Sequence, residues 1–161
     1  MVSIAHDFLR AASAISPDST FIIATNLHKG LDWYKIMPDK LKKMSTSCEI
    51  QSPGSNIPLP VLFINNGQAT IMGTSKGYAV IFEAKHGKRV QALKHGAGDG
   101  LYTHNAKAYA ELENGRRMIA TGDGNCGERT RIMIWTENPK DSSSRVSKLR
   151  FILFKIVSYA F

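Results

Sequence analysis

Short apolar stretches and polar turns alternate along most of the chain. Most stretches have four to six residues, are rich in Ile, Val, Thr and aromatic residues, and are bounded by Gly, Asn, Pro or Asp. Apolar positions recur only weakly at the helical period of about 3.6 residues, so the pattern favours short antiparallel strands over helices. We therefore expect an all-β chain.

One local plan, three strands separated by two turns, occurs three times. The first turns of the copies begin at residues 16, 65 and 113, which gives spacings of 49 and 48 residues. The expected strands are 11–15, 20–24 and 31–34, then 61–64, 69–74 and 78–82, then 106–112, 117–121 and 130–135. A turn at 85–88 leads to a further strand at 89–93. Four-stranded units that recur every 40 to 50 residues or so are typical of a β-propeller, whose sheets pack face to face around a channel.

Several residues stand at matching places in the copies. A Ser-Pro-Asp turn begins at residue 16, a histidine lies ten residues before it, glycines close the turn before the third strand, and an aromatic residue ends that strand. With this pattern, residues 6 to about 137 resemble the WD-repeat (tryptophan–aspartate) family of β-propellers. The resemblance implies a structural role in the repeat for His6, Ser16, Asp18, Gly30, Tyr34, Gly77, Phe82 and Trp135.

The copies also depart from the family pattern. The aspartate expected before the closing glycine is Lys29 in the first copy and Lys76 in the second. The residue after the aromatic is Lys35, Glu83 and Thr136 in turn. The hydrogen-bonded His/Asp/Ser/Trp network of the family is thus incomplete in every copy. We expect apolar packing to hold the sheets together instead.

The repeats divide the chain into a body and a tail. Residues 1–139 are interpreted as three degenerate WD-type repeats, about 4–38, 57–95 and 100–137; the linker between the first two includes the basic run 40–43 and loops out over 44–55. At a period of about 48 residues, the chain of 161 residues holds about three blades, whereas propellers typically have about 4 to 8. We therefore expect a partial, open β-propeller, a fragment of a longer one, whose exposed end faces favour self-association.

The tail, residues 140–161, breaks the repeat. It carries five Lys or Arg residues against one Asp, so it holds +4 of the net charge of +8, and it is mostly apolar from residue 149. Three interpretations fit it: a last strand, a basic segment on a membrane surface, or sequence that does not belong to the fold. We favour the third, and therefore expect a basic, hydrophobic tail outside the repeat.

The basic turn from Lys85 to Arg89 suits salt-dependent contacts with phosphates. No aromatic platform for bases accompanies it, so a solvated hairpin is favoured and a nucleic-acid partner is not expected. Residues 1–10 lack the pattern of a secretory signal, and no apolar run approaches the roughly 20 residues of a membrane-spanning helix. We expect an intracellular protein, cytoplasmic or nuclear, without a transmembrane segment.

Motifs that carry chemistry are weak in this sequence. Residues 122–127 match G-x-G-x-x-G, but the strand pattern at 130–135 follows where a dinucleotide site needs a helix N-terminus, so we interpret the motif as a loop. The histidines and the two cysteines show neither H-x₃-H nor C-x-x-C spacing, so no metal site is expected. His6 and His95 are interpreted as residues of the blade network, and the cysteines as free thiols. No cofactor and no catalytic residue is expected.

These observations favour a non-enzymatic scaffold for protein–protein interactions, because the WD-repeat propellers that the chain resembles mostly bind other proteins through loops on rigid sheets. The sequence assigns neither the partner nor the binding residues. The alternative is a salt-dependent binder of polyanions, RNA or an anionic membrane, that uses the basic hairpin and the tail.

Overall fold

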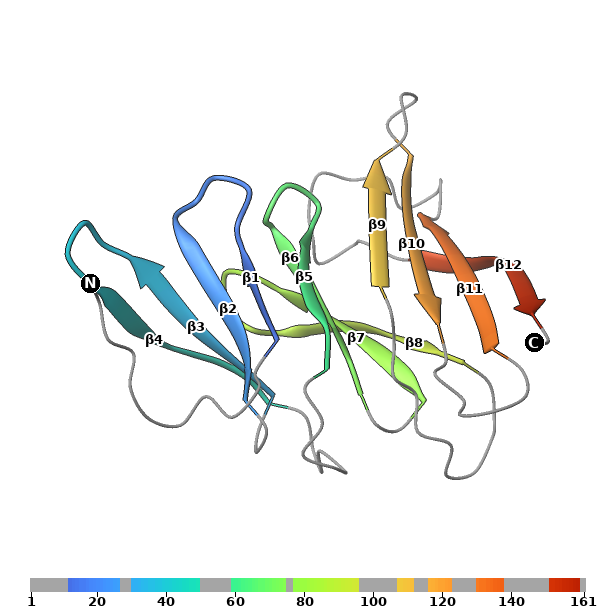
Figure 1. Cartoon of the computed structure of the whole chain (residues 1–161), viewed down its shortest axis with the longest axis horizontal. Helices are drawn as coiled ribbons and strands as arrows, with labels where there is room; N and C mark the ends of the chain where they lie inside the picture. The colour runs from blue at the N-terminus through green and yellow to red at the C-terminus, as the bar shows by residue number, and fades with distance from the viewer. Residues whose placement is uncertain are drawn as a thin grey trace.

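The described residues form three four-stranded antiparallel sheets (Figure 1). The structure, a computed structural model, describes residues 12–26, 30–49, 59–74, 77–95, 107–111, 116–122, 130–137 and 151–159. Within these ranges no helix is long and apolar enough to cross a membrane. The expectation of an all-β fold built from four-stranded sheets is confirmed.

Each sheet follows chain order from its first strand to its fourth. The first sheet contains β1 (Ser13–Ile15), β2 (Phe21–Asn26), β3 (Gly30–Ile36) and β4 (Leu41–Glu49). The second contains β5 (Val61–Ile64), β6 (Ala69–Gly73), β7 (Tyr78–Glu83) and β8 (Arg89–Lys94). The third contains β9 (Lys107–Glu111), β10 (Arg117–Gly122), β11 (Thr130–Glu137) and β12 (Phe151–Tyr159).

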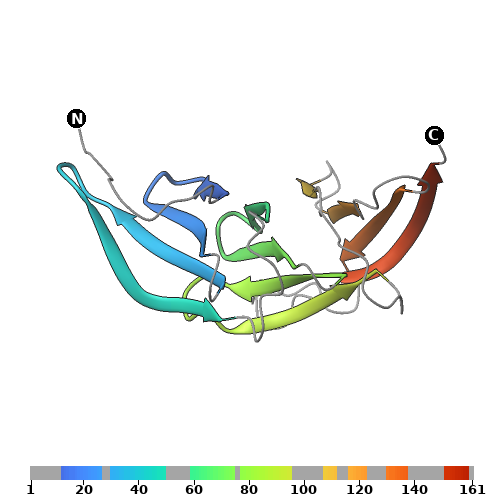
Figure 2. The same ribbon diagram turned by 60° about the horizontal axis from the view of Figure 1, so that its bottom comes forward.

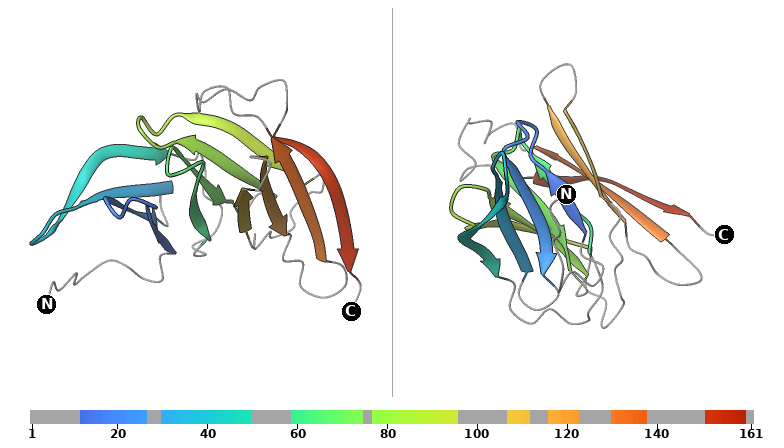
Figure 3. Two further views of the ribbon diagram at one scale, coloured as in Figure 1. Left: turned by 90° about the horizontal axis from the view of Figure 1, so that it is seen from above. Right: turned by 60° about the vertical axis from the view of Figure 1, so that its left-hand side comes forward.

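The three sheets stand next to one another along an open arc (Figure 2). The fourth strands, β4, β8 and β12, lie on the convex side of the arc, and the first strands, β1, β5 and β9, lie on the concave side. The view from above in Figure 3 shows the same curvature. β5 contacts both β1 and β9, so the first strands line the inside of the arc. This arrangement is that of neighbouring blades in a propeller that is not closed.

The second sheet is covered on both faces, and the core consists of the two interfaces that it makes. Every residue of β6 is buried. The interface with the first sheet contains Ile23, Leu31, Trp33, Val61, Met72, Val80 and Phe82. The interface with the third sheet contains Ile64, Ala69, Ile71, Ala79, Ile81, Leu93, Ile119, Met133, Trp135 and Phe151. Alternate residues of β7 face opposite neighbours, as the period of a strand requires.

The expected linker from residue 40, with its loop over 44–55, is wrong in part, because Leu41–Glu49 forms β4. β4 pairs antiparallel with β3, with Lys42 opposite Lys35 and Lys43 opposite Tyr34. Lys42 and Lys43 are exposed on this outermost strand of the sheet. Since an outer strand has one neighbour and abundant solvent, its sequence is polar and resembles that of a loop.

The tail is also corrected, because Phe151–Tyr159 forms β12 and completes the third sheet beside β11. Phe151 is 2% exposed and belongs to the interface between the second and third sheets. The Gln91 side chain on β8 donates from Nε2 to the Phe151 carbonyl at 2.7 Å and accepts from the Phe151 N–H at 2.8 Å. The apolar composition of this segment therefore reflects a last strand, the first of the three interpretations.

Candidate binding cavity between the first and second sheets

The Ser-Pro-Asp sequence forms the turn between β1 and β2. The Ser16 hydroxyl accepts from the Phe21 and Thr20 N–H groups at 2.9 and 3.2 Å and donates to Asp18 Oδ1 at 2.6 Å. The Thr20 N–H also reaches Asp18 Oδ1 at 3.1 Å. Hydrogen bonds from the Ser16 and Thr20 side chains, and then from the Thr20 backbone, lower the pKa of Asp18. The turn is thus fixed by its own side chains.

The three aromatic residues that resemble the signature tryptophan lie on third strands: Tyr34 on β3, Phe82 on β7 and Trp135 on β11. Phe82 packs in the interface of the first and second sheets, and Trp135 in that of the second and third, so each faces the preceding sheet. Burial, and then the Asp32 carboxylate, raise the pKa of Tyr34. His6 lies outside the described residues.

The glycines assigned to the turn before the third strand lie at that place. Gly30 is the first residue of β3 and Gly77 immediately precedes β7, with φ of 131° and 77°. Both angles favour glycine, because a Cβ atom is strained there. The structural roles that the resemblance implies for these positions are compatible with where they lie and remain predictions.

A buried polar cluster joins the second and third sheets. Trp135 Nε1 donates to Thr121 Oγ1 at 2.9 Å, and both side chains are buried. The ring of His95, which is 2% exposed, lies 6.4 Å from that of Trp135 between centroids. The sequence had placed His95 in such a network, but it gave no indication of Thr121, one of many hydroxyl residues in the expected strands.

Three aromatic rings from different strands meet between the first and second sheets. Trp33 on β3 is 4% exposed. The Phe63 ring on β5 lies 5.5 Å from it at 84°, and the Phe21 ring on β2 lies 6.4 Å from it at 70°, so both pairs are edge-to-face. Rings at such angles do not stack flat, and space is left beside them.

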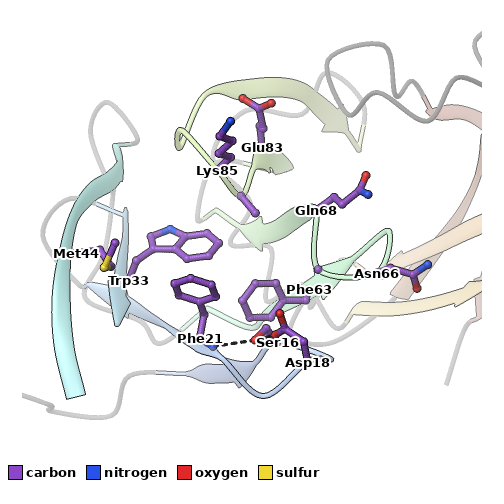
Figure 4. Close-up of a pocket in the computed structure, with 12 residues that line it drawn as sticks. Ser16, Asp18, Phe21, Trp33, Met44, Phe63, Asn66, Gln68, Glu83 and Lys85 are labelled. Carbon is purple, nitrogen blue, oxygen red and sulfur yellow. Dashed lines mark hydrogen bonds between the residues drawn. The ribbon is translucent and has the colours of Figure 1, made fainter. Parts of the chain in front are cut away.

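That space is a cavity of about 560 Å³ (Figure 4). Its wall consists of the three rings with Met44 from β4. Its rim comes from turns at one end of the two sheets and carries Ser16, Asp18, Asn66, Gly67, Gln68, Glu83, Ala84 and Lys85. The cavity therefore has an aromatic wall and a polar rim of mixed charge.

The turns that form the rim are tied to one another. A Cβ atom on Gly67, whose φ is +81°, would lie 3.2 Å from Pro17 Cδ, so the β1–β2 and β5–β6 turns touch. The Ala84 N–H donates to the Gln68 carbonyl at 2.9 Å, which joins the β5–β6 turn to the β7–β8 turn. Asn65, at φ 51°, donates from Nδ2 to Gln68 Oε1 at 3.1 Å. These contacts link the three turns that surround the mouth of the cavity.

The polar groups of the cavity differ in how they are satisfied. Glu83 Oε2 lies 2.9 Å from His86 Nδ1, while Asp18 accepts from its own turn. Trp33 Nε1 is buried, and no acceptor for it lies among the described residues. In Figure 4 the nitrogen edge of the Trp33 indole is turned away from Phe21, toward the side of Glu83 and Lys85. A buried N–H without an acceptor is rare in native structures.

Sequence reasoning did not find this cavity. Phe21, Trp33 and Phe63 are spread over 42 positions and form no linear motif. They meet because β2, β3 and β5 lie in adjacent sheets, and a fold-level argument does not fix which side chains share an interface. The available signal was the concentration of aromatic residues in the first repeat and at the start of the second.

The glycine-rich motif, the expected absence of a metal site and the two cysteines are the remaining sequence predictions. Most of the glycine-rich motif at 122–127 lies outside the described residues, and the chain continues from Thr130 as β11, a strand. No group of three His, Cys, Asp or Glu side chains suited to a metal ion occurs in the described part of the chain. The Cys126 and Cys48 thiols are not among the described side chains, so their free state stays a prediction.

Comparison with known proteins supports the architecture. No family model and no curated protein sequence matches the chain. A solved structure of a candidate 6-phosphogluconolactonase from Bacteroides uniformis is similar, with a TM-score of 0.60 and 16% identity over 92% of this chain and 43% of that one. The β-propeller domain of Cps50 (Swd1) from Myceliophteria thermophila is similar at a TM-score of 0.58 and 14% identity, over 92% of this chain and 46% of that one. The chain spans less than half the length of these structures, and its fold is that of a partial β-propeller.

Proposed function

We propose that the chain is a non-enzymatic module for protein–protein interactions, built as part of a longer propeller of degenerate WD-type repeats. The observation that carries this proposal is the aromatic cavity, whose rim is made of three turns fixed to rigid sheets. Turns on a rigid scaffold offer pre-organised contacts, which lowers the ordering entropy lost on binding. An aromatic pocket with a polar rim is also the usual form of the energetic centre of a protein interface.

The ionisable groups at the rim favour binding over catalysis. Asp18 is engaged by Ser16 and Thr20, which keep its carboxyl ionised, and Glu83 is engaged by His86. A general acid or base needs a pKa near the working pH and access to the reacting proton. Asp18 does not meet the first need, because its pKa is held below an already acidic value.

The length of the chain supports the second part of the proposal. Both similar structures are more than twice as long as the segment that this chain matches. The first and third sheets each have one face that no further sheet covers among the described residues, and terminal blades of such arrays need a cap or a partner. Further blades, or self-association through these faces, fill this need.

A capture experiment with matched variants tests the interaction role. The immobilised chain is exposed to cell extract at salt concentrations from 50 to 500 mM, roughly the range that separates electrostatic from apolar binding. Phe63→Ala removes an aromatic wall of the cavity, and Lys88→Ala, on the exposed hairpin, serves as the control. Salt-insensitive capture of one defined protein that fails with Phe63→Ala and survives Lys88→Ala supports the proposal.

Two results would overturn it. One is capture that Phe63→Ala leaves unchanged at every salt concentration. The other is hydrolysis of 6-phosphogluconolactone, the reaction in the name of one similar structure, by the folded chain above the rate of a heat-unfolded sample.

Binding of a polyanion remains the second candidate, because Lys85, Lys88 and Arg89 are exposed on the β7–β8 hairpin. Neutralising several phosphates releases counterions, so affinity for RNA or anionic vesicles would fall steeply as salt rises. Charge reversal by Lys88→Glu with Arg89→Glu abolishes such binding if the hairpin carries it. Unchanged binding by this double variant excludes the hairpin.

A further inference from the structure

We infer that the cavity between the first and second sheets binds an alkylated ammonium group, an organic cation whose nitrogen carries methyl groups in place of N–H donors. The inference rests on the proposed function, because it names the ligand chemistry of the same site.

The aromatic rings form the walls of a corner in the cavity (Figure 4). The Trp33 ring lies at 84° to that of Phe63 and at 70° to that of Phe21, with centroids 5.5 and 6.4 Å away. Phe21 and Phe63 stay partly exposed although they pack against the core. A cation is attracted to the face of an aromatic ring within about 6 Å of its centroid. Rings at steep angles allow one such group to lie close to more than one of them.

The apolar wall offers no hydrogen-bonding group of its own. Trp33 Nε1 is buried and has no accessible surface, so Trp33 adds apolar surface to the wall and no donor. Met44 from β4 is the fourth residue of the wall, and its side chain is also partly exposed. A ligand group that enters this part of the cavity therefore meets ring and thioether surface, which suits methyl groups.

The charged residues of the lining favour a cation over an anion. Two carboxylates, of Asp18 and Glu83, line the cavity against one ammonium, of Lys85. Hydrogen bonds from Ser16 and then Thr20 lower the pKa of Asp18, so this carboxylate is charged at neutral pH. The net charge of +8 belongs to the whole chain. At physiological salt, exposed charges more than about 8 Å apart are largely screened, so the charges of the lining weigh most.

The carboxylates at the rim already accept hydrogen bonds. Asp18 Oδ1 accepts from the Ser16 hydroxyl at 2.6 Å and from the Thr20 N–H at 3.1 Å. Glu83 Oε2 lies 2.9 Å from His86 Nδ1. A primary ammonium is strongly hydrated and would lose hydrogen bonds to water beside the rings. An alkylated ammonium keeps the charge that the carboxylates attract and has fewer N–H groups to satisfy, or none.

The size of the cavity admits such a group but does not select it. A volume of about 560 Å³ lies inside the range of about 300–1,000 Å³ typical of ligand pockets. A neutral aliphatic group of the same shape would meet the same walls. The charge of the ligand is therefore the property that the experiment must isolate.

Choline and 3,3-dimethylbutan-1-ol isolate the charge, because the two molecules have nearly the same shape and differ in having nitrogen or carbon at the branched centre. Each is titrated into the full chain and followed by ligand-observed NMR. We expect saturable binding of choline and about tenfold weaker binding of the neutral alcohol. Equal or tighter binding of the alcohol would show that the cavity is only an apolar pocket and would overturn the inference.

Matched variants locate the site. Phe63→Leu keeps apolar volume and removes a ring, and should weaken choline about fivefold. Asp18→Asn keeps an oxygen for the turn and removes a charge, and should weaken choline about threefold. Lys85→Gln removes the positive charge of the lining and should tighten choline about twofold, whereas Lys88→Gln, an exposed residue of the same hairpin outside the lining, should bind like the wild type.

The variants also separate a local effect from unfolding. Circular dichroism should show that each variant keeps the β-structure of the wild type. Tighter binding by Lys85→Gln has a further value, because a variant that merely loses structure does not gain affinity. Choline affinity that Phe63→Leu, Asp18→Asn and Lys85→Gln all leave unchanged would place binding elsewhere and overturn the inference.

Two sources of the cation are distinguished by a second pair of probes. Nα-acetyl-Nε-trimethyl-L-lysinamide presents the group as a modified lysine side chain of a partner protein, and Nα-acetyl-L-lysinamide presents the same side chain without methyl groups. Tighter binding of the trimethylated probe than of choline assigns the cation to a partner protein, and the reverse assigns it to a free small molecule. Equal binding of the two lysine probes would contradict the requirement for methyl groups.

The outcomes also separate this inference from the proposed function. Capture of a partner that needs Phe63 and is competed neither by choline nor by the trimethylated probe overturns the inference and leaves the proposed function standing. Binding of choline by a chain that captures no protein overturns the proposed function and leaves the inference standing.

Discussion

Substitution of Gly67 by alanine tests whether the first and second sheets are fitted together through their turns. Gly67 has a φ of +81°, and a Cβ atom there would lie 3.2 Å from Pro17 Cδ in the first sheet. Gly77 is a matched control within the second sheet, because its φ is +77° and no atom lies within 4 Å of its built Cβ. The two substitutions share the backbone strain and differ in the contact between the sheets.

The expected magnitudes follow from these two terms. A residue with a Cβ atom in the left-handed region is destabilised by about 1–2 kcal/mol, and this strain applies at both sites. Replacing glycine also lowers the entropy of the unfolded chain, which offsets about 0.4–1 kcal/mol equally at both. The contact at Gly67 adds overpacking, at the low end of about 1–3 kcal/mol, because Pro17 is a rigid ring in a turn that Ser16 holds by hydrogen bonds.

Gly67→Ala should therefore lower the free energy of unfolding by about 1 kcal/mol more than Gly77→Ala. In a chain of this length the difference corresponds to a Tm about 2–4 °C lower. Urea denaturation followed by tryptophan fluorescence gives the free energies, and calorimetry gives the Tm values. An equal loss for the two variants, or a larger loss for Gly77→Ala, would show that the turns do not press on each other and that the rim of the cavity is not fixed by them.

Three further predictions concern other parts of the fold. Thr121→Val leaves the buried Trp135 N–H without its acceptor and should lower the free energy of unfolding by about 1–3 kcal/mol in the same urea assay. The control is Thr70→Val, which should be neutral or stabilising because the buried Thr70 hydroxyl has no partner among the described residues. Gln91→Leu removes the amide that joins β8 to β12 and should destabilise by about 1–3 kcal/mol; if thermal unfolding is unchanged, β12 is not anchored to the second sheet. The hydrogen bonds that Asp18 accepts lower its pKa in the folded state, so they stabilise the fold above the ordinary pKa of 3.8, and this stabilisation is lost as the pH falls through the lower folded pKa. Asp18→Asn should therefore flatten the acid limb of a curve of unfolding free energy against pH. An acid limb that Asp18→Asn leaves unaltered would contradict this role of Asp18.

Sequence alone predicted the fold well where a strand is covered on both faces. β5 and β7 read as apolar runs between Gly and Asn turns because the second sheet has a neighbour on each side. The predictions for the two outer strands β4 and β12 were wrong for opposite reasons. β4 resembled a linker because its lysines are followed by Ser and Thr residues. β12 was interpreted as lying outside the fold because it is too apolar for a free terminus, and two of its apolar residues, Ile152 and Leu153, are indeed half-exposed.

The cavity was not predictable in the same way, because it depends on a difference between two interfaces of one sheet. Toward the third sheet the second sheet presents only aliphatic side chains to the core, among them the fully buried Ala69 and Ala79, and Gln91 bonds with the backbone of β12 across the interface. Toward the first sheet it presents aromatic side chains as well, Phe63 and Phe82, and the edge-to-face rings around Trp33 fill the interface unevenly. Alternation along a strand tells which residues share a face, but not how the facing side chains fit.

The two interfaces of the second sheet also differ in the surroundings of their tryptophans. The second and third sheets share an interface that includes a hydrogen-bonded indole, because Trp135 Nε1 donates to Thr121 Oγ1. The first and second sheets share an interface in which the indole of Trp33 keeps its donor unsatisfied beside an open cavity. Natural cores rarely leave such a group buried without a partner. Two tryptophans on third strands of the same fold thus differ: Trp135 has an acceptor, whereas Trp33 has none among the described residues and lies in the interface that contains the cavity.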